Sequence, residues 1–328
     1  MRAVQGADLQ SADSYHLLEL PTPDPGPQEV RVRISACGVG YVDALVALGR
    51  YQVRPKLPHN PGWEVSGWID AIGDEVRDLL PGQRCLTVVR GGGFAEYALA
   101  RAGDVVALPD NMRLDQAAGF YLNYGTALHA LRDRAYLQPG EILLVIGAAG
   151  GVGLAAVQLG RLLGATVIAV ASTAEKRALA LKCGAALALD REPDGWRDRL
   201  REMAPGGIDV VFDPVSGPLL QPAFRSLRWR GRYLVVGFAA GAIPALPLNL
   251  PLLKGSALIG VDYRQFSDVF EAETARQELK ELLGWVSEGR IDPPVGRRFP
   301  FEEYREALAF ALSGKGSGKT ILEIAPGP

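Results

Sequence analysis

The sequence has few cysteines and no long apolar run, and its positive and negative charges nearly balance. Its 328 residues include three scattered cysteines and no Cys-x-x-Cys pair, so we expect free thiols in a cytoplasmic protein. No apolar run approaches the roughly 18 residues that span a bilayer, and the N-terminus has no signal-peptide pattern. The 35 Lys and Arg against 37 Asp and Glu give no electrostatic reason to expect a nucleic-acid partner.

A glycine-rich loop is the most informative pattern in the chain. Residues 147–153 read GAAGGVG, after an apolar run at 142–146 and before an apolar-periodic segment at 154–163. A strand, a glycine turn and a helix in this order typically place a dinucleotide pyrophosphate on the helix N-terminus. A tight turn without a ligand is the alternative. The predicted cofactor contacts in this loop are Ala149, Gly150, Gly151, Val152 and Gly153.

The end of the next predicted strand indicates which dinucleotide is bound. Ala171 stands where an NAD-binding site usually has Asp or Glu for the ribose hydroxyls. Ser172 and Thr173 offer hydroxyl groups, and Lys176 offers a positive charge, all of which favour a 2′-phosphate. We therefore predict NADPH as the cofactor, with these three residues near its phosphate. The alternative is that Ser172 or Thr173 only caps the predicted helix 174–182 and that Lys176 is a solvated surface charge.

The order of strand and helix signals predicts an α/β protein with three segments. Residues 1–112 carry short alternating strand signals broken by Gly and Pro, which indicate a compact barrel-like domain. Strands and helices alternate over 113–261, as in a doubly wound parallel sheet, with one strand predicted at 232–236. The pattern changes again over 262–328, and we expect this tail to return to the first domain. The active site is expected between the two domains.

These features together resemble the zinc-free quinone oxidoreductase (zeta-crystallin-like) branch of the medium-chain dehydrogenase/reductase superfamily. The resemblance covers nearly the whole chain. It implies a Rossmann-type NADPH-binding domain, a GroES-like β-barrel catalytic domain and, usually, a homodimer. Besides the glycine loop, it is carried by ACGVGYVD at 36–43, PGWEVSG at 61–67, GTA at 125–127, DVVFDPVSG at 209–217 and VGF at 236–238.

The resemblance also implies which metal chemistry to expect. Zinc-dependent relatives have Cys at the position of Gly40 and His at the position of Trp63, and neither glycine nor tryptophan ligates zinc. We therefore predict no metal site. Without a Lewis acid to polarise an alcohol, we expect a zinc-independent oxidoreductase. It would transfer a hydride from NADPH to a small quinone or α,β-unsaturated carbonyl.

Position in the family implies the remaining site residues. Tyr51 is implied beside the cofactor, and Tyr51 and Tyr41 are the candidate catalytic proton donors. Many quinone reductases have Asn where this chain has Gly40, so that amide is absent here. The alternatives are that Tyr51 packs under Pro55 and that Lys319 is a solvated lysine. The implied cofactor contacts outside the glycine loop are Asn123, Thr126, Gly237, Phe238 and Lys319.

Two other functions fit the same pattern. One is an enoyl-thioester (enoyl-CoA-type) reductase, which a basic coenzyme-A-binding patch at the mouth of the cleft would support. The other is a low-turnover NADPH-binding protein with a structural or RNA-binding role, as in some zeta-crystallin relatives. The near-neutral net charge of −2 gives RNA binding no support.

Overall fold

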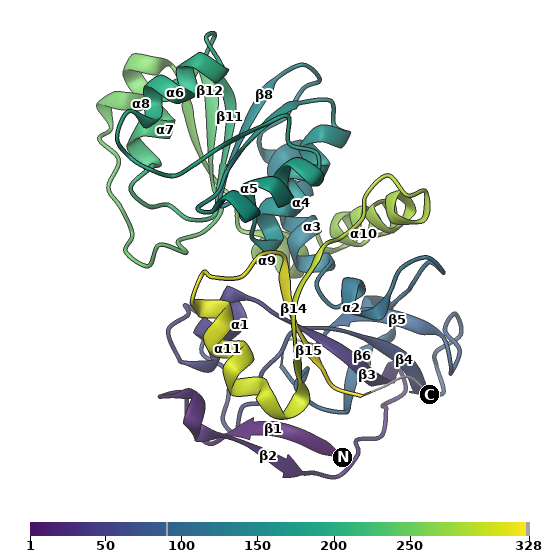
Figure 1. The fold of residues 1–328 in the computed structure, drawn as a ribbon. Coiled ribbons are helices and arrows are strands. Elements are labelled where there is room, and N and C mark those ends of the chain that lie inside the picture. The colour runs from purple at the N-terminus through teal and green to yellow at the C-terminus, as the bar shows by residue number, and fades with distance from the viewer. Residues whose placement is uncertain (90, 326–328) are drawn as a thin grey trace. The chain divides into compact units, whose positions relative to one another are not determined.

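The chain folds into two compact units in a computed structural model that describes residues 1–89 and 91–325 (Figure 1). The first unit comprises Met1–Leu122 and Lys280–Pro328, and the second comprises Asn123–Leu279. The chain passes between them within α3 (Tyr121–Leu128) and within α10 (Ala272–Ser287). This division by packing is separate from the three domains proposed from the sequence, whose boundaries stay a prediction.

The second unit is built on a six-stranded parallel sheet. Its spatial order, β10-β9-β8-β11-β12-β13, is that of a doubly wound nucleotide-binding sheet. β8 is apolar along its whole length and almost fully buried, as expected where helices cover both faces of a sheet. The predicted Rossmann-type sheet is confirmed. The strands are β8 (Ile142–Ile146), β9 (Thr166–Val170), β10 (Leu187–Leu189), β11 (Ile208–Asp213), β12 (Leu227–Val235) and β13 (Ala257–Gly260).

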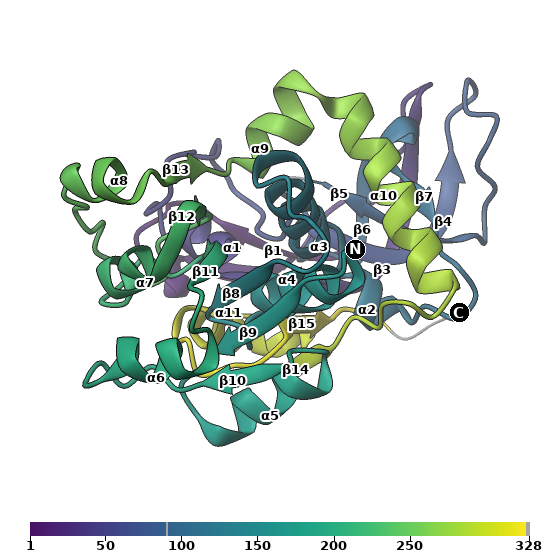
Figure 2. The same cartoon turned by 90° about the horizontal axis from the view of Figure 1, so that it is seen from above.

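Helices alternate with these strands along the chain (Figure 2). The helix predicted at 174–182 has those bounds in the structure, because a threonine cap starts it and Gly184 follows it. A π-helix, His129–Arg134, continues α3, and another, Phe266–Phe270, follows α9. The helices are α4 (Gly151–Leu162), α5 (Ala174–Lys182), α6 (Trp196–Met203), α7 (Leu220–Ser226), α8 (Asn249–Lys254) and α9 (Tyr263–Gln265).

The first unit is mainly antiparallel. β3 and β4 form its centre, and the C-terminal strand β15 pairs antiparallel with β3, so the end of the chain returns to the sheet that the first 110 residues build. The strands are β1 (Arg2–Gly6), β2 (Tyr15–Glu19), β3 (Glu29–Val39), β4 (Glu64–Ile72), β5 (Arg84–Val88), β6 (Tyr97–Arg101), β7 (Val106–Ala107), β14 (Val295–Pro300) and β15 (Lys319–Glu323). The helices are α1 (Tyr41–Ala47), α2 (Leu114–Ala117) and α11 (Tyr304–Leu312).

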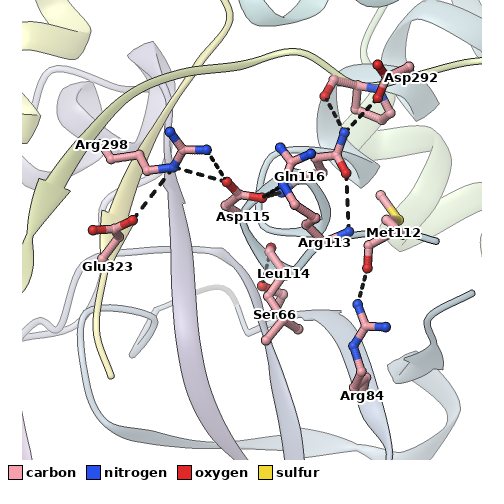
Figure 3. Close-up of polar contacts among 11 residues, drawn as sticks. Ser66, Arg84, Met112, Arg113, Leu114, Asp115, Gln116, Asp292, Arg298 and Glu323 are labelled. Carbon is pink, nitrogen blue, oxygen red and sulfur yellow. Dashed lines mark hydrogen bonds and ion pairs between the residues drawn. The ribbon is translucent and has the colours of Figure 1, made fainter. Parts of the chain in front are cut away.

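Side chains also tie the returning segment to the first unit (Figure 3). Asp115 in α2 accepts a hydrogen bond of 3.0 Å from Nε of Arg298 in β14. The neighbouring Gln116 donates through its amide to Asp292 at 2.7 Å. These contacts join residues about 180 positions apart in the chain. The returning strands are therefore part of the same folded body as α2.

Each unit has its own apolar core. In the first unit, Cys37 and Cys85 are fully buried among valines, isoleucines and phenylalanines. Burial raises the pKa of both thiols, which keeps them protonated and unreactive. The second core packs Trp196, Phe224 and Tyr233 with the apolar side chains of the parallel sheet. All three cysteines are free thiols.

Candidate functional site

The glycine loop joins β8 to α4 in the second unit. Gly147 has a φ of +66°, which side chains rarely tolerate. A Cβ on Gly153 would lie 2.2 Å from the carbonyl oxygen of Gly147, so only glycine lets α4 approach the loop this closely. A Cβ on Gly151 would lie 2.7 Å from the side-chain nitrogen of Asn123. Asn123 therefore lies directly against the loop, as its predicted role requires.

The start of α4 offers hydrogen-bond donors. Gly150 is its N-cap residue and has no side chain to cap it, and the first turn carries no acidic residue. The first N–H groups of a helix have no partner within the helix, and the helix dipole adds positive potential there. A Cβ on Gly150 would meet nothing closer than 3.5 Å. These residues therefore fit a pyrophosphate approaching the backbone.

A buried hydrogen-bond network positions the loop after β11, next to the glycine loop. Asp213 accepts hydrogen bonds from the backbone N–H groups of Val215, at 2.7 Å, and Ser216, at 2.9 Å. Its other oxygen accepts one of 2.5 Å from the hydroxyl of Tyr233. A Cβ on Gly147 would lie 2.8 Å from Val215. Sequence reasoning missed this network, although Asp213 stands at the end of an apolar strand.

Gly237 and Phe238 lie just after β12, at the same edge of the sheet. The backbone N–H of Val236 donates to the carbonyl of Asp213, which joins the two strand ends. A Cβ on Gly237 would lie 3.1 Å from the carbonyl oxygen of Pro214. The side chain of Phe238 is 40% exposed. The structure thus brings both residues beside the β11 loop, and their contact with a cofactor stays a prediction.

The helix after β9 begins with a capped turn. Thr173 is the N-cap residue of α5, and its hydroxyl accepts a hydrogen bond of 3.2 Å from the backbone N–H of Lys176. The capping role considered for Ser172 or Thr173 is therefore confirmed for Thr173. Ser172 is half-buried just before the cap. The carboxyl end of β9 is followed by Ser172, Thr173 and Lys176, so capping by Thr173 is compatible with phosphate binding by this turn.

Two cations interact at this edge. Burial lowers the pKa of Lys176, and the nearby positive charge of Arg191 lowers it further. Arg191 stands two residues after β10, so it also lies at the carboxyl edge of the sheet. Two neighbouring cations suit a phosphate group. Sequence reasoning missed Arg191, and the signal that identifies it is its place two residues after the short apolar strand β10.

In α3, Thr126 is half-buried and follows a glycine that allows close packing. A Cβ on Gly125 would lie 2.1 Å from the hydroxyl oxygen of Tyr263, at the start of α9. Tyr263 follows β13, so it too comes from the carboxyl edge of the sheet. The sequence did not single out Tyr263, because nothing in its neighbourhood links it to position 125.

In the first unit, Lys319 is buried rather than solvated. It is 8% exposed, and its Nζ lies 3.7 Å from a carboxylate oxygen of the fully buried Glu64. Its aliphatic stem runs past two glycines. A Cβ on Gly38 would lie 2.8 Å from Cε of Lys319, and one on Gly119 would lie 2.6 Å from Cγ. The alternative of a solvated lysine is therefore wrong.

Lys319 ends beside Gly40, the N-cap residue of α1. A Cβ on Gly40 would lie 3.2 Å from Nζ of Lys319 and 3.0 Å from Oδ2 of Asp43. The backbone N–H of Gly40 donates to that Asp43 oxygen at 2.7 Å. Burial raises the pKa of Glu64 to about 7, although the charge of Lys319 lowers it in part. The absence of a side chain at position 40 thus leaves room for a buried ion cluster.

Of the two candidate proton donors, Tyr41 lies between Gly40 and Asp43 in the sequence, and Tyr51 comes eight residues after Asp43. Tyr41 is the first residue of α1, and Tyr51 follows that helix by four residues; both are half-buried. Within residues 1–89 and 91–325, no three His, Cys, Asp or Glu side chains gather as they would around a metal ion. The first unit contains three of the predicted site residues, Tyr41, Tyr51 and Lys319. The second unit contains all the others, including those of the glycine loop.

Comparisons with known proteins identify the family. Residues 26–110 match the family described as alcohol dehydrogenase GroES-like domain, and residues 151–286 match zinc-binding dehydrogenase. The chain is 36% identical to quinone oxidoreductase-like protein 2 of Bos taurus over 94% of its own length and 89% of that protein. It is 32% identical to the quinone oxidoreductase of Homo sapiens, over 98% and 97% of the two chains. The chain belongs to the quinone oxidoreductase family of medium-chain dehydrogenases/reductases.

Solved structures agree with this assignment. The Escherichia coli quinone oxidoreductase, solved in complex with NADPH, matches with a TM-score of 0.89 and 25% identity, over 98% of this chain and 100% of that one. The predicted family, Rossmann-type sheet and GroES-like domain are confirmed. Across the part of the chain that the structure describes, no helix is both long and apolar enough to cross a membrane.

Proposed function

We propose that this chain is an NADPH-dependent oxidoreductase that transfers a hydride to a quinone or an α,β-unsaturated carbonyl without a metal. The observation that carries the proposal is the glycine loop. Its Gly150 and Gly151 leave the start of α4 open to a pyrophosphate, and Asn123 lies against it. The related E. coli enzyme is a quinone oxidoreductase with bound NADPH, which supports the same assignment here.

The choice of NADPH over NADH rests on the end of β9. Ala171 carries no carboxylate to repel a 2′-phosphate. Ser172, Thr173, Lys176 and the additional Arg191 would hold that phosphate by charged hydrogen bonds. When bound, the cofactor supplies the hydride. The protein's own part is to bind it at the carboxyl edge of the sheet, with Thr126, Gly237 and Phe238 as further contacts.

The proton side of the reaction is assigned to the first unit. Gly40 and Trp63 cannot ligate zinc, so side chains must stabilise the oxyanion or enolate that develops on the acceptor. Lys319 is already held by Glu64. We assign the donor role to the hydroxyl of Tyr51, with that of Tyr41 as the second candidate, because each is half-buried and ends in a weak acid.

A second copy of the chain is the proposed partner. β13 is the last strand of the parallel sheet, so no strand of residues 1–89 or 91–325 lies beside its outer edge. Exposed leucines lie near this edge: Leu258 on β13, and Leu252 and Leu253 on α8, which are 79% and 70% exposed. An apolar surface beside an open strand edge suits a homodimer.

The test is a panel of acceptors assayed with NADPH. Steady NADPH oxidation with a small quinone or an enone is the expected result. Faster turnover with an enoyl-coenzyme A than with either would instead favour the enoyl-thioester reductase. NADPH binding without turnover on any acceptor would favour a structural or RNA-binding role.

A further inference from the structure

A basic cavity lies at the edge of the sheet opposite to the glycine loop. Its volume is about 260 Å³, and it is lined by the turns that lead into β11 and β12, at Gly206–Ile208 and Ser226–Arg228. These are the amino ends of the strands, whereas the glycine loop follows the carboxyl end of β8. α6 packs against α7, and α7 against α8, around this end of the second unit (Figure 1).

The lining of the cavity holds five cations and no carboxylate. The cations are Arg197, Arg201, Arg225, Arg228 and Lys254. The whole chain has a formal charge of −2, so this concentration of positive charge runs against the overall balance. Four of the five are arginines, whose planar forks bind phosphate oxygens in pairs.

Several of these charges have no acidic partner. Arg228 is paired with Asp209, and Arg201 lies 3.3 Å from the exposed Asp198. Among the described residues, the other three cations form no ion pair. Burial lowers the pKa of Lys254, and the nearby charge of Arg197 lowers it further. The cations in the cavity therefore repel one another, and an anion would relieve this repulsion.

Helix ends explain only part of this charge. α6, α7 and α8 all end beside the cavity, and each has a cation in its last turn, Arg201, Arg225 and Lys254. Such cations offset the partial negative charge of the helix carbonyls. Arg197 is in the first turn of α6, where the dipole disfavours a cation, and it is four residues from Arg201, a spacing that destabilises like charges. An anion in the cavity accounts for both features.

We propose that this cavity binds the diphosphate group of a small anion, either inorganic pyrophosphate or a nucleoside diphosphate. Its volume of about 260 Å³ admits such a group and is too small for a whole dinucleotide. A single-stranded nucleic acid is a poorer occupant, because such sites combine cations with stacked aromatic side chains. The lining contains no aromatic residue.

The test is calorimetric titration of the full chain with pyrophosphate and, separately, with ADP. Binding that weakens with added salt is expected for both ligands if the diphosphate group is what is recognised. Arg225→Gln should weaken pyrophosphate binding at least tenfold. Arg225 is exposed and makes no ion pair with the described residues, so the variant should keep the melting temperature of the wild type.

Two controls separate this site from general charge effects and from the cofactor site. Arg230→Gln removes one positive charge from an exposed residue of β12, five positions after Arg225, that does not line the cavity, and should change affinity less than twofold. The glycine loop also fits a pyrophosphate, so the titrations are repeated with saturating NADPH, which fills that loop and should leave the affinity for both diphosphates unchanged. Equal losses in Arg225→Gln and Arg230→Gln, loss of diphosphate binding when NADPH is saturating, or no binding by the wild type would each overturn the proposal. So would a single-stranded RNA that binds more tightly than either diphosphate and loses affinity in Arg225→Gln.

Discussion

Among single residues, the side chains that meet the cofactor phosphate decide which dinucleotide the protein prefers. Lys176 and Arg191 interact across the ends of β9 and β10, and no acid follows β9 directly. A phosphate that both cations contact would be held by charge-assisted hydrogen bonds, which are stronger than those between neutral groups. NADH has a neutral 2′-hydroxyl in place of this phosphate, so Lys176 and Arg191 have no charged group to bind.

The first prediction concerns this discrimination. NADPH should bind at least about tenfold more tightly than NADH, which corresponds to about 1.4 kcal/mol. Lys176→Ala and Arg191→Ala should each weaken NADPH and leave NADH nearly unchanged. Quenching of tryptophan fluorescence during titration measures both dissociation constants. Equal constants for the two cofactors in the wild type would end the NADPH assignment.

The second prediction concerns the proton donor. If the hydroxyl of Tyr51 stabilises the developing oxyanion, Tyr51→Phe should lower kcat roughly tenfold or more while NADPH affinity barely changes. The decrease in kcat should be larger with an enone than with a quinone, because an enolate needs its proton more than a hydroquinone anion does. Steady-state kinetics with both acceptors, on Tyr51→Phe and Tyr41→Phe, measures this. Unchanged kcat in both variants would leave water as the proton source.

At the scale of elements, a buried carboxyl couples α10 to the π-helix that continues α3. Glu278 is 2% exposed, and one of its oxygens accepts a hydrogen bond of 2.7 Å from Arg132. Asp133 hydrogen-bonds to His129 at 2.9 Å in the same cluster. Burial, followed by the hydrogen bond to Asp133, raises the pKa of Glu278 above its ordinary value of 4.5. The folded protein therefore binds a proton that the unfolded chain releases more readily.

The third prediction follows from the sign of this shift. Stability from a carboxyl with a raised folded pKa is present at low pH and is lost as pH rises from about 4.5 through the folded pKa. Glu278→Gln mimics the protonated form, so its melting temperature should fall less than that of the wild type between about pH 5 and pH 9. The exposed Glu271→Gln is the control and should follow the wild type. An equal fall of melting temperature with pH in all three proteins would contradict the raised pKa of Glu278.

The sequence predicts elements well where the signals are local, and less well where they are not. The helix 174–182 was predicted with its observed bounds, because Thr173 and Gly184 mark its ends. The strand predicted at 232–236 begins five residues earlier, at Leu227. The first residues of this strand include exposed arginines, and Arg230 has a positive φ. The start of the strand therefore lacks the sequence pattern typical of a strand. The burial of Lys319 depends on Gly38 and Gly119, which lie far from it in the chain, so no local pattern predicts it.

At the scale of the whole molecule, the apolar surface beside β13 indicates self-association. Leu252 and Leu253 are mostly exposed, and Leu258 lies on the edge strand itself. Burying such side chains against a second copy would contribute roughly 1.5–3 kcal/mol for each one fully covered. A charge placed there would have to be buried without a partner.

The fourth prediction is that the protein is a dimer whose contact includes α8. The double variant Leu252→Glu, Leu253→Glu should sediment as a monomer and keep its fold, whereas the wild type sediments as a dimer. Leu80→Glu, at a leucine that is 60% exposed in the first unit, is the control and should stay dimeric. Analytical ultracentrifugation decides. A monomeric wild type, or a double variant that remains a dimer, would exclude this interface.

Metal-free turnover of NADPH underlies the proposed function, and zinc analysis combined with a rate assay tests it. The purified protein is dialysed against a chelator and its zinc content determined. The rates of NADPH and NADH oxidation are then measured with a small quinone as acceptor. We predict well under one zinc per chain, an undiminished rate with NADPH and a lower kcat/KM with NADH. Stoichiometric zinc that is lost together with activity, or no oxidation of NADPH at all, would contradict the account.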